Sequence, residues 1–144
     1  MRDRACGQGL IMYIRFISPE RASRGRGYYG VFQAAFDLVY DDCTPDFVYA
    51  PVREILDWFN DNLPAPTGRD FRVRSRKRWH ADGICWFRDD AQEMIARAHL
   101  LARLVSEWHV PIATLTTRHP GQILYRDDYQ VVAKPHAATP IAWQ

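Results

Sequence analysis

The residues best suited to chemistry lie in one basic stretch, from Arg69 to His80. Within residues 69–78, five Arg and Lys77 outnumber a single acid, Asp70, for a net charge of +5. Cationic side chains neutralise backbone phosphates, guanidinium groups bind them in a bidentate manner, and aromatic rings stack on bases. The sequence therefore predicts contact with phosphate or nucleic acid through Arg72, Arg74, Arg76, Lys77, Arg78, Trp79 and His80.

A second basic loop, residues 21–26, precedes an expected helix. Its cations would lie beside the helix N-terminus, where backbone N–H groups and the helix dipole favour anions. Residues 25–30 also match the pattern G-x-G-x-x-G, but seven residues separate Gly25 from the expected strand end at Ile17. That gap excludes the tight turn of a dinucleotide-binding fold. We expect Arg24 and Arg26 to bind phosphate together with the first basic loop.

An enzyme acting on a phosphate-bearing nucleotide or nucleic acid would use the same basic residues differently. His80 would serve as general acid or base, and the cations at Arg24, Arg26, Arg76 and Arg78 would stabilise the reacting phosphate. The spacing gives no catalytic geometry, so we assign no catalytic residue and favour a non-catalytic role. The five histidines lack metal-ligand spacing, and the sequence predicts neither a metal site nor a cofactor.

Acidic residues dominate the segment from residue 27 to residue 68, where seven acids accompany only Arg53. This charge allows a third function, a protein–protein adaptor or inhibitor that uses Asp37, Asp41, Asp42, Asp57 and Asp61. It also allows the basic loop at 69–80 to dock on the acidic helices, or to remain solvated, without any ligand. The same basic loop could instead meet an acidic surface of a partner protein.

Three widely separated cysteines argue against a disulfide framework and for a reducing compartment. No apolar run approaches the roughly 18 residues of a membrane-spanning helix, and no secretory signal is recognised. We therefore predict a cytoplasmic protein with no membrane partner. Cys85 is expected to lie buried in a strand and to be inert.

The elements that must position these residues follow from apolar periodicity. Strands are expected at 12–17, 84–87 and 112–117, and a hairpin at 122–134 turns at Asp127 and Asp128. A helix is expected at 28–40, with Phe36 on its apolar face, and another at 51–62 after a short turn over 45–49 that has its N-cap at Thr44. A third is expected from an N-cap at Asp90 to Trp108, which lies on the apolar face of that helix. An additional edge strand is allowed at Phe71–Arg74.

The predicted architecture is a single α+β domain over residues 12–135, with a leader at 1–11 and a tail at 136–144 outside it. Its order is β-α-α-β-α-β-β, and its mixed sheet ends in an antiparallel hairpin. If the strands at 84–87 and 112–117 share this sheet, they are expected to run parallel, because the long helix connects them. The pattern from Pro120 to Ala133 resembles short bacterial proteins of unassigned function, and this resemblance implies no activity. The function predicted is a small cytoplasmic bacterial or phage binding module that contacts nucleic acid or a nucleoprotein through loops 21–26 and 69–80.

Overall fold

Alternating and helical apolar patterns produce five strands and three helices. Their order agrees with the predicted β-α-α-β-α-β-β once the hairpin at 122–134 is counted as its two strands, which brings the total from four to five. The structure, a computed structural model, describes residues 11–19, 30–65, 83–136 and 139. The helices are α2 (Val31–Val39), α3 (Asp46–Asn62) and α5 (Gln92–Trp108). The strands are β1 (Tyr13–Ile17), β2 (Ile84–Arg88), β3 (Ala113–Thr117), β4 (Gln122–Arg126) and β5 (Gln130–Lys134).

The five strands form one sheet in the order β3-β1-β2-β5-β4, and every neighbouring pair is antiparallel. The predicted α+β class and C-terminal hairpin are thus confirmed, whereas the sheet is antiparallel rather than mixed. β2 and β3 do run parallel to each other, as predicted for strands joined through a helix. However, β1 lies between them and pairs antiparallel with both, so the described sheet has no parallel neighbours.

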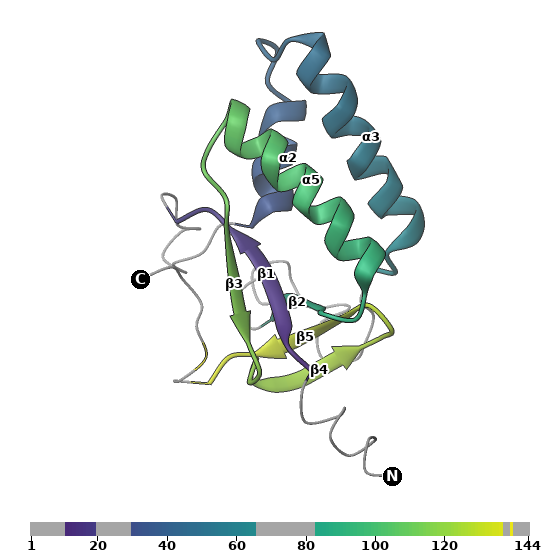
Figure 1. Cartoon of the computed structure of the whole chain (residues 1–144), viewed down its shortest axis with the longest axis vertical. Helices are drawn as coiled ribbons and strands as arrows, with labels where there is room; N and C mark the ends of the chain where they lie inside the picture. Colours follow the sequence, from purple (N-terminus) through teal and green to yellow (C-terminus); the bar gives the residue numbers. More distant parts are fainter. Residues whose placement is uncertain (1–10, 20–29, 66–82, 137–138, 140–144) are drawn as a thin grey trace.

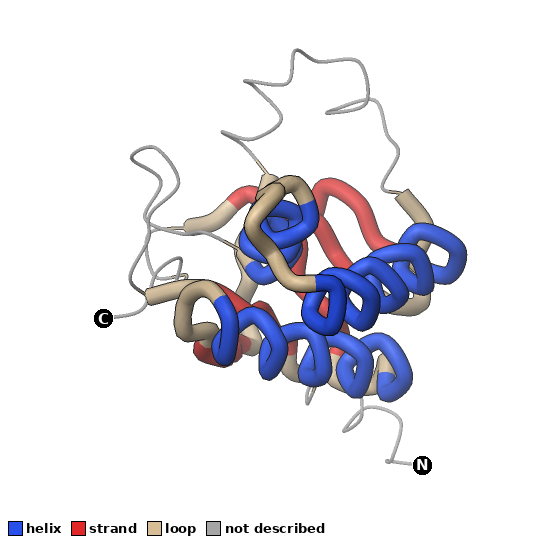
Figure 2. Tube along the Cα trace, turned by 90° about the horizontal axis from the view of Figure 1, so that it is seen from above, coloured by secondary structure: helices blue, strands red, loops and turns tan. Residues whose placement is uncertain are grey.

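Helices α2, α3 and α5 gather on one side of the sheet, where α3 and α5 run side by side (Figures 1 and 2). The main core lies between this layer and the sheet and includes Phe16, Phe87, Ala98 and Leu101. Neighbouring strand residues point the other way, because side chains alternate along a strand. Ile17, Trp86 and Val131 belong to a second apolar cluster on that opposite face.

Pro51 lies inside α3, which runs without interruption from Asp46 to Asn62. The separate turn predicted over 45–49 is therefore wrong, whereas the helix predicted over 51–62 is confirmed as the larger part of α3. The missing N–H removes one intrahelical hydrogen bond. One buried stripe nevertheless continues from one side of the proline to the other, and its burial outweighs that loss; it consists of Val48, Val52, Ile55, Leu56 and Phe59.

Two predicted helix caps are also absent. Asp90 does not cap α5, because its carboxylate accepts two hydrogen bonds from the guanidinium of Arg88, at 2.8 and 2.9 Å. The hydroxyl of Thr44 does not cap α3 but donates to the carbonyl of Leu38, at the end of α2. In both cases a nearby partner outside the helix competes successfully for the polar side chain.

Candidate functional site

The residues predicted to bind nucleic acid or phosphate lie outside the described part of the structure. These residues are Arg24, Arg26, Arg72, Arg74, Arg76, Lys77, Arg78, Trp79 and His80. The possible edge strand at 71–74 lies outside it too. Nucleic-acid binding, and the alternative phosphate chemistry at the same residues, accordingly stay predictions from the sequence. The described residues instead present two other candidate sites, one at each end of the α3–α5 pair.

The first candidate is a surface where the end of α2, the start of α3 and the end of α5 meet. We call it the acidic aromatic corner. It consists of Phe36, Asp37, Tyr40, Asp41, Asp42, Asp46, Phe47 and Trp108. Tyr40 is 74% exposed, Phe47 68% and Trp108 43%. Aromatic side chains of this size usually contribute to a core or to an interface, so their exposure here marks the surface as unusual.

Two contacts join the three helices at this corner. The rings of Phe47 and Trp108 meet edge to face with centroids 5.2 Å apart, which connects α3 to α5. His109 Nε2 lies 3.3 Å from Asp37 Oδ2, which connects the end of α5 to α2. On α2 itself, Phe36 and Tyr40 stack at 6.0 Å. The aromatic residues therefore belong to one region of the helical layer.

The loop between α2 and α3 is ordered by its own polar groups. Asp41 Oδ1 accepts a hydrogen bond from the Cys43 N–H at 2.9 Å, and the Thr44 hydroxyl donates to Leu38 O at 2.7 Å. The part of the corner that belongs to α2, to the loop and to the start of α3 carries negative charge only, since no Lys or Arg occurs from residue 27 to residue 52. Asp41, Asp42 and Asp46 form no ion pair among the described residues.

Sequence reasoning missed the aromatic half of this surface because it placed Phe36 and Trp108 on buried helix faces. The buried stripe of α2 is Val31, Ala34, Ala35, Leu38 and Val39, which turns Phe36 outward. In α5 the buried stripe ends at Val105, three residues before Trp108. The small residues of these helices favour the observed rotation. Ala34 and Ala102 permit closer packing against a neighbouring helix than aromatic rings do.

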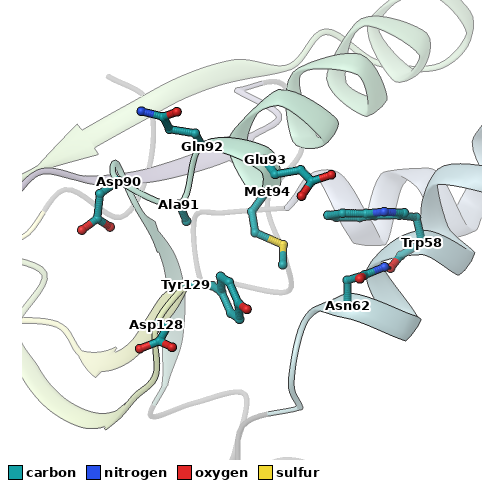
Figure 3. A pocket seen from close by; sticks show the side chains of 9 residues that line it. All are labelled: Trp58, Asn62, Asp90, Ala91, Gln92, Glu93, Met94, Asp128 and Tyr129. Carbon is teal, nitrogen blue, oxygen red and sulfur yellow. The ribbon is translucent and has the colours of Figure 1, made fainter.

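The second candidate is a cavity of about 220 Å3 at the other end of the α3–α5 pair (Figure 3). Three segments line it: the end of α3, the start of α5, and the turn between β4 and β5. The lining residues are Trp58, Asn62, Asp90–Met94, Asp128 and Tyr129. Aromatic rings, a thioether and carboxylates therefore converge on one small space. This convergence is not predicted from the sequence, because the three segments are distant along the chain.

Asp127 holds the β4–β5 turn that forms one wall of the cavity. Its Oδ1 accepts hydrogen bonds from the N–H groups of Tyr129 and Gln130, at 2.8 and 3.0 Å. Its Oδ2 accepts from the Tyr125 hydroxyl at 2.7 Å and from Gln130 Nε2 at 3.0 Å. Gln130 Nε2 also donates to Pro64 O at 2.8 Å, which ties the turn to the segment after α3. These bonds agree with the turn predicted at Asp127 and Asp128.

The same network shifts two pKa values. Burial opposes ionisation of Asp127, but hydrogen bonds led by those from Gln130 and Tyr129 outweigh it and lower the pKa of its carboxyl. The Tyr125 hydroxyl donates to that carboxylate, and losing its proton would place two negative charges together. This hydrogen bond, with burial and the charge of Asp127, raises the pKa of Tyr125 to about 12.

Two arginines neutralise part of the negative charge around the cavity. Arg88 pairs with Asp90, and its hydrogen bonds lower the pKa of that carboxyl. Arg97 lies 3.7 Å from Glu93 and places its guanidinium 4.4 Å from the centre of the Trp58 ring. No described residues form a group of three His, Cys, Asp or Glu side chains that could hold a metal ion.

Cys85 retains solvent-accessible surface, which differs from its predicted burial. Desolvation nevertheless raises the pKa of its thiol to about 11, so the thiol stays protonated at neutral pH, in agreement with the predicted lack of reactivity. The core between the helices and the sheet includes Phe87 of the same strand but not Cys85.

None of the helices that the structure describes has the length and apolar character needed to cross a bilayer. Comparison with protein-family models, with curated proteins and with solved structures gives no match to this chain.

Proposed function

We propose that this protein is a protein-docking module whose acidic aromatic corner binds an Arg- and Lys-rich segment of a partner protein. The observation that supports the proposal is the combination at one place of exposed Tyr40, Phe47 and Trp108 with four aspartates and no Lys or Arg from residue 27 to residue 52. This function belongs to the adaptor or inhibitor class that the acidic segment predicted.

The chemistry of the corner favours a basic partner. Tyr, Trp and Phe are enriched in protein interfaces, where they bury a large area at a small cost in side-chain entropy. Aspartates around them attract cations and repel acidic surfaces. Arginine suits both features, because its guanidinium pairs with carboxylates and also stacks on aromatic rings. A partner segment rich in Arg would therefore use the whole corner, whereas an uncharged apolar segment would use only its rings.

The experiment measures binding of the full-length protein to a labelled peptide of alternating Arg and Leu by fluorescence anisotropy. The matched peptide replaces each Arg with Gln. We expect saturable binding of the first peptide, weakened by added salt, and no binding of the second. Tyr40→Ala and Phe47→Ala should each weaken binding at least about tenfold, as expected for aromatic hot spots.

Glu54→Gln serves as the control for charge, because Glu54 is exposed in the middle of α3 and belongs to neither candidate site. Its variant should bind the Arg peptide as the wild type does, whereas Asp42→Asn should bind more weakly. Equal binding of the Arg and Gln peptides would contradict the proposal. So would dimers of the protein that dissociate in Tyr40→Ala, because the corner would then bind a second copy of the chain.

Binding of nucleic acid through residues 21–26 and 69–80 is a separate proposal that rests on the charge of these two segments and on the aromatic ring of Trp79. If it is correct, Arg76→Ala combined with Arg78→Ala should flatten the salt dependence of oligonucleotide binding by about 1.5 in log–log slope. Tyr40→Ala and Phe47→Ala should leave oligonucleotide binding unchanged, so this assay reports on a different part of the protein. Equal slopes in the double variant and the wild type would argue against these two contacts.

A further inference from the structure

We infer that the cavity between α3, α5 and the β4–β5 turn binds a small organic monocation, specifically an alkylguanidinium group. The cavity measures about 220 Å3, which is below the usual range of drug-sized sites and close to the size of one long side chain. It lies at the opposite end of the α3–α5 pair from the acidic aromatic corner. The inference therefore stands independently of the docking function.

Among the described residues, one carboxylate of the cavity forms no ion pair, although the charge of Arg88 acts on it. Asp90 is paired with Arg88, and Glu93 is paired with Arg97. Asp128 forms no ion pair among the described residues, although it lies in the same cavity wall. The three lining carboxylates and the two guanidinium groups paired with them carry a net charge of about −1 at neutral pH, and the ionised Asp127 of the same turn adds to this negative charge. A cationic ligand would offset part of this charge.

The walls of the cavity fit an organic cation better than a metal ion or an anion. Trp58, Tyr129 and Met94 supply aromatic and thioether surface beside the carboxylates (Figure 3). Cations are attracted to the faces of such rings, and the Trp58 ring already carries the guanidinium of Arg97 at 4.4 Å. No group of three metal-ligating side chains occurs among the described residues. The carboxylates at Glu93 and Asp128 would repel an anion.

A guanidinium is favoured over a compact ammonium by the shape of its partners. Its plane can present two parallel N–H donors to the Asp128 carboxylate, and its weakly hydrated faces can lie against an aromatic ring. An alkyl chain attached to it would contact Met94, whose flexible thioether adapts to irregular apolar groups. Such a group can come from a free small molecule or from an arginine side chain of a peptide.

The test titrates the full-length protein with butylguanidinium and with butylurea, its uncharged counterpart of similar shape. Binding is followed by calorimetry and by amide NMR shifts of Ala91–Met94 and Tyr129. For a ligand of this size we expect a dissociation constant on the order of 0.1–1 mM for butylguanidinium, and no saturation by butylurea. A second titration uses a short blocked peptide with one arginine. Tighter binding of butylguanidinium would identify a free small molecule as the source of the guanidinium group, and tighter binding of the peptide would identify an arginine side chain.

Asp128→Asn should weaken butylguanidinium binding by about tenfold, since it removes one charge-assisted bidentate contact. Glu54→Gln, which removes one negative charge in the middle of α3 and outside both candidate sites, should bind as the wild type does. The inference is overturned if butylurea binds equally well, if Asp128→Asn keeps full affinity, or if no shift appears at the cavity amides. Because Asp128 is exposed, the folded state of its variant can be verified by the unchanged remainder of the NMR spectrum.

Discussion

The two ends of the α3–α5 pair use the same kinds of residue in opposite ways. At the acidic aromatic corner, Phe47 of α3 meets Trp108 of α5, and both rings remain exposed. At the cavity, Trp58 of α3 meets Arg97 of α5, which covers part of the ring with a guanidinium. Aspartates at the corner lack ion pairs among the described residues, except that Asp37 contacts His109. Carboxylates at the cavity are mostly paired.

This difference indicates what each end can bind. An exposed aromatic surface with uncompensated negative charge offers area and attraction to a large basic partner. A small cavity offers room for a single cationic group, and it includes one carboxylate that forms no ion pair within the described part of the chain. The helices that separate the two sites are packed through buried Ala98, Leu101 and Val105, so both ends depend on one core.

The largest expected effect comes from Ala98→Asp, which places a carboxylate in that shared core. Ala98 is fully buried in the middle of α5. A buried charge without a partner costs several kcal/mol, so we expect a loss of about 4 kcal/mol or more in the free energy of unfolding. This is comparable to the whole stability of a small domain, and thermal melts followed by circular dichroism should show an unfolded protein.

Arg97→Ala is the matched control on the same helix. It removes a partly exposed contact with Trp58 and a weak ion pair with Glu93, so its cost should be about 0.5–1 kcal/mol. Similar melting temperatures for the two variants would show that the buried face of α5 has been assigned incorrectly. The two ends would then not share the core described above.

An intermediate effect is expected from Asp127→Asn, which should act at the cavity and not at the corner. The pKa of Asp127 is lower in the folded protein than in the unfolded chain. Its stabilising contribution is therefore complete above the unfolded value, near pH 4, and is lost as the pH falls through the folded value. The asparagine cannot accept the bonds that reach Oδ2, so the loss at neutral pH should be about 1–2 kcal/mol.

Denaturant unfolding at several pH values measures this effect. The wild type should lose more stability on acidification than Asp127→Asn, and the two curves should converge in acid. Asp90, whose pKa is lowered by Arg88, is present in both proteins and should make both curves fall. A constant difference between the curves at all pH values would mean that the charge of Asp127 does not stabilise the turn.

The sequence predicts the framework of this fold well because its apolar periods are long and local. The strands at 13–17, 84–88 and 113–117, the final hairpin and the order of elements all follow from alternation and turn residues. The predictions from the sequence are wrong where tertiary contacts determine the local structure. Pro51 stays helical because buried residues continue on both sides of it, and Asp90 binds Arg88 instead of capping α5.

The two candidate sites were less accessible to sequence reasoning for a related reason. Neither site is continuous in the chain: the corner joins residues 36–47 to residue 108, and the cavity joins residues 58–62 to residues 90–94 and 128–129. Periodicity within one helix or strand does not predict which distant segments are neighbours in the folded protein. The acidic charge of residues 37–61 was visible in the sequence, but the exposure of Phe36 and Trp108 required knowledge of how each helix is rotated.

The smallest expected effect on stability, and the sharpest test of the comparison, comes from Phe47→Ala. Phe47 is 68% exposed at the start of α3, so little apolar area is lost when its ring is removed. Exposed substitutions of this kind usually change the free energy of unfolding by no more than about 0.5 kcal/mol, less than we expect for Arg97→Ala. The same variant should nevertheless lose most of its affinity for the Arg peptide. Denaturant unfolding and peptide anisotropy on one preparation measure both effects. A stability loss above about 1 kcal/mol would show that the ring belongs to the core through Trp108, and the corner would then resemble the cavity end instead of differing from it.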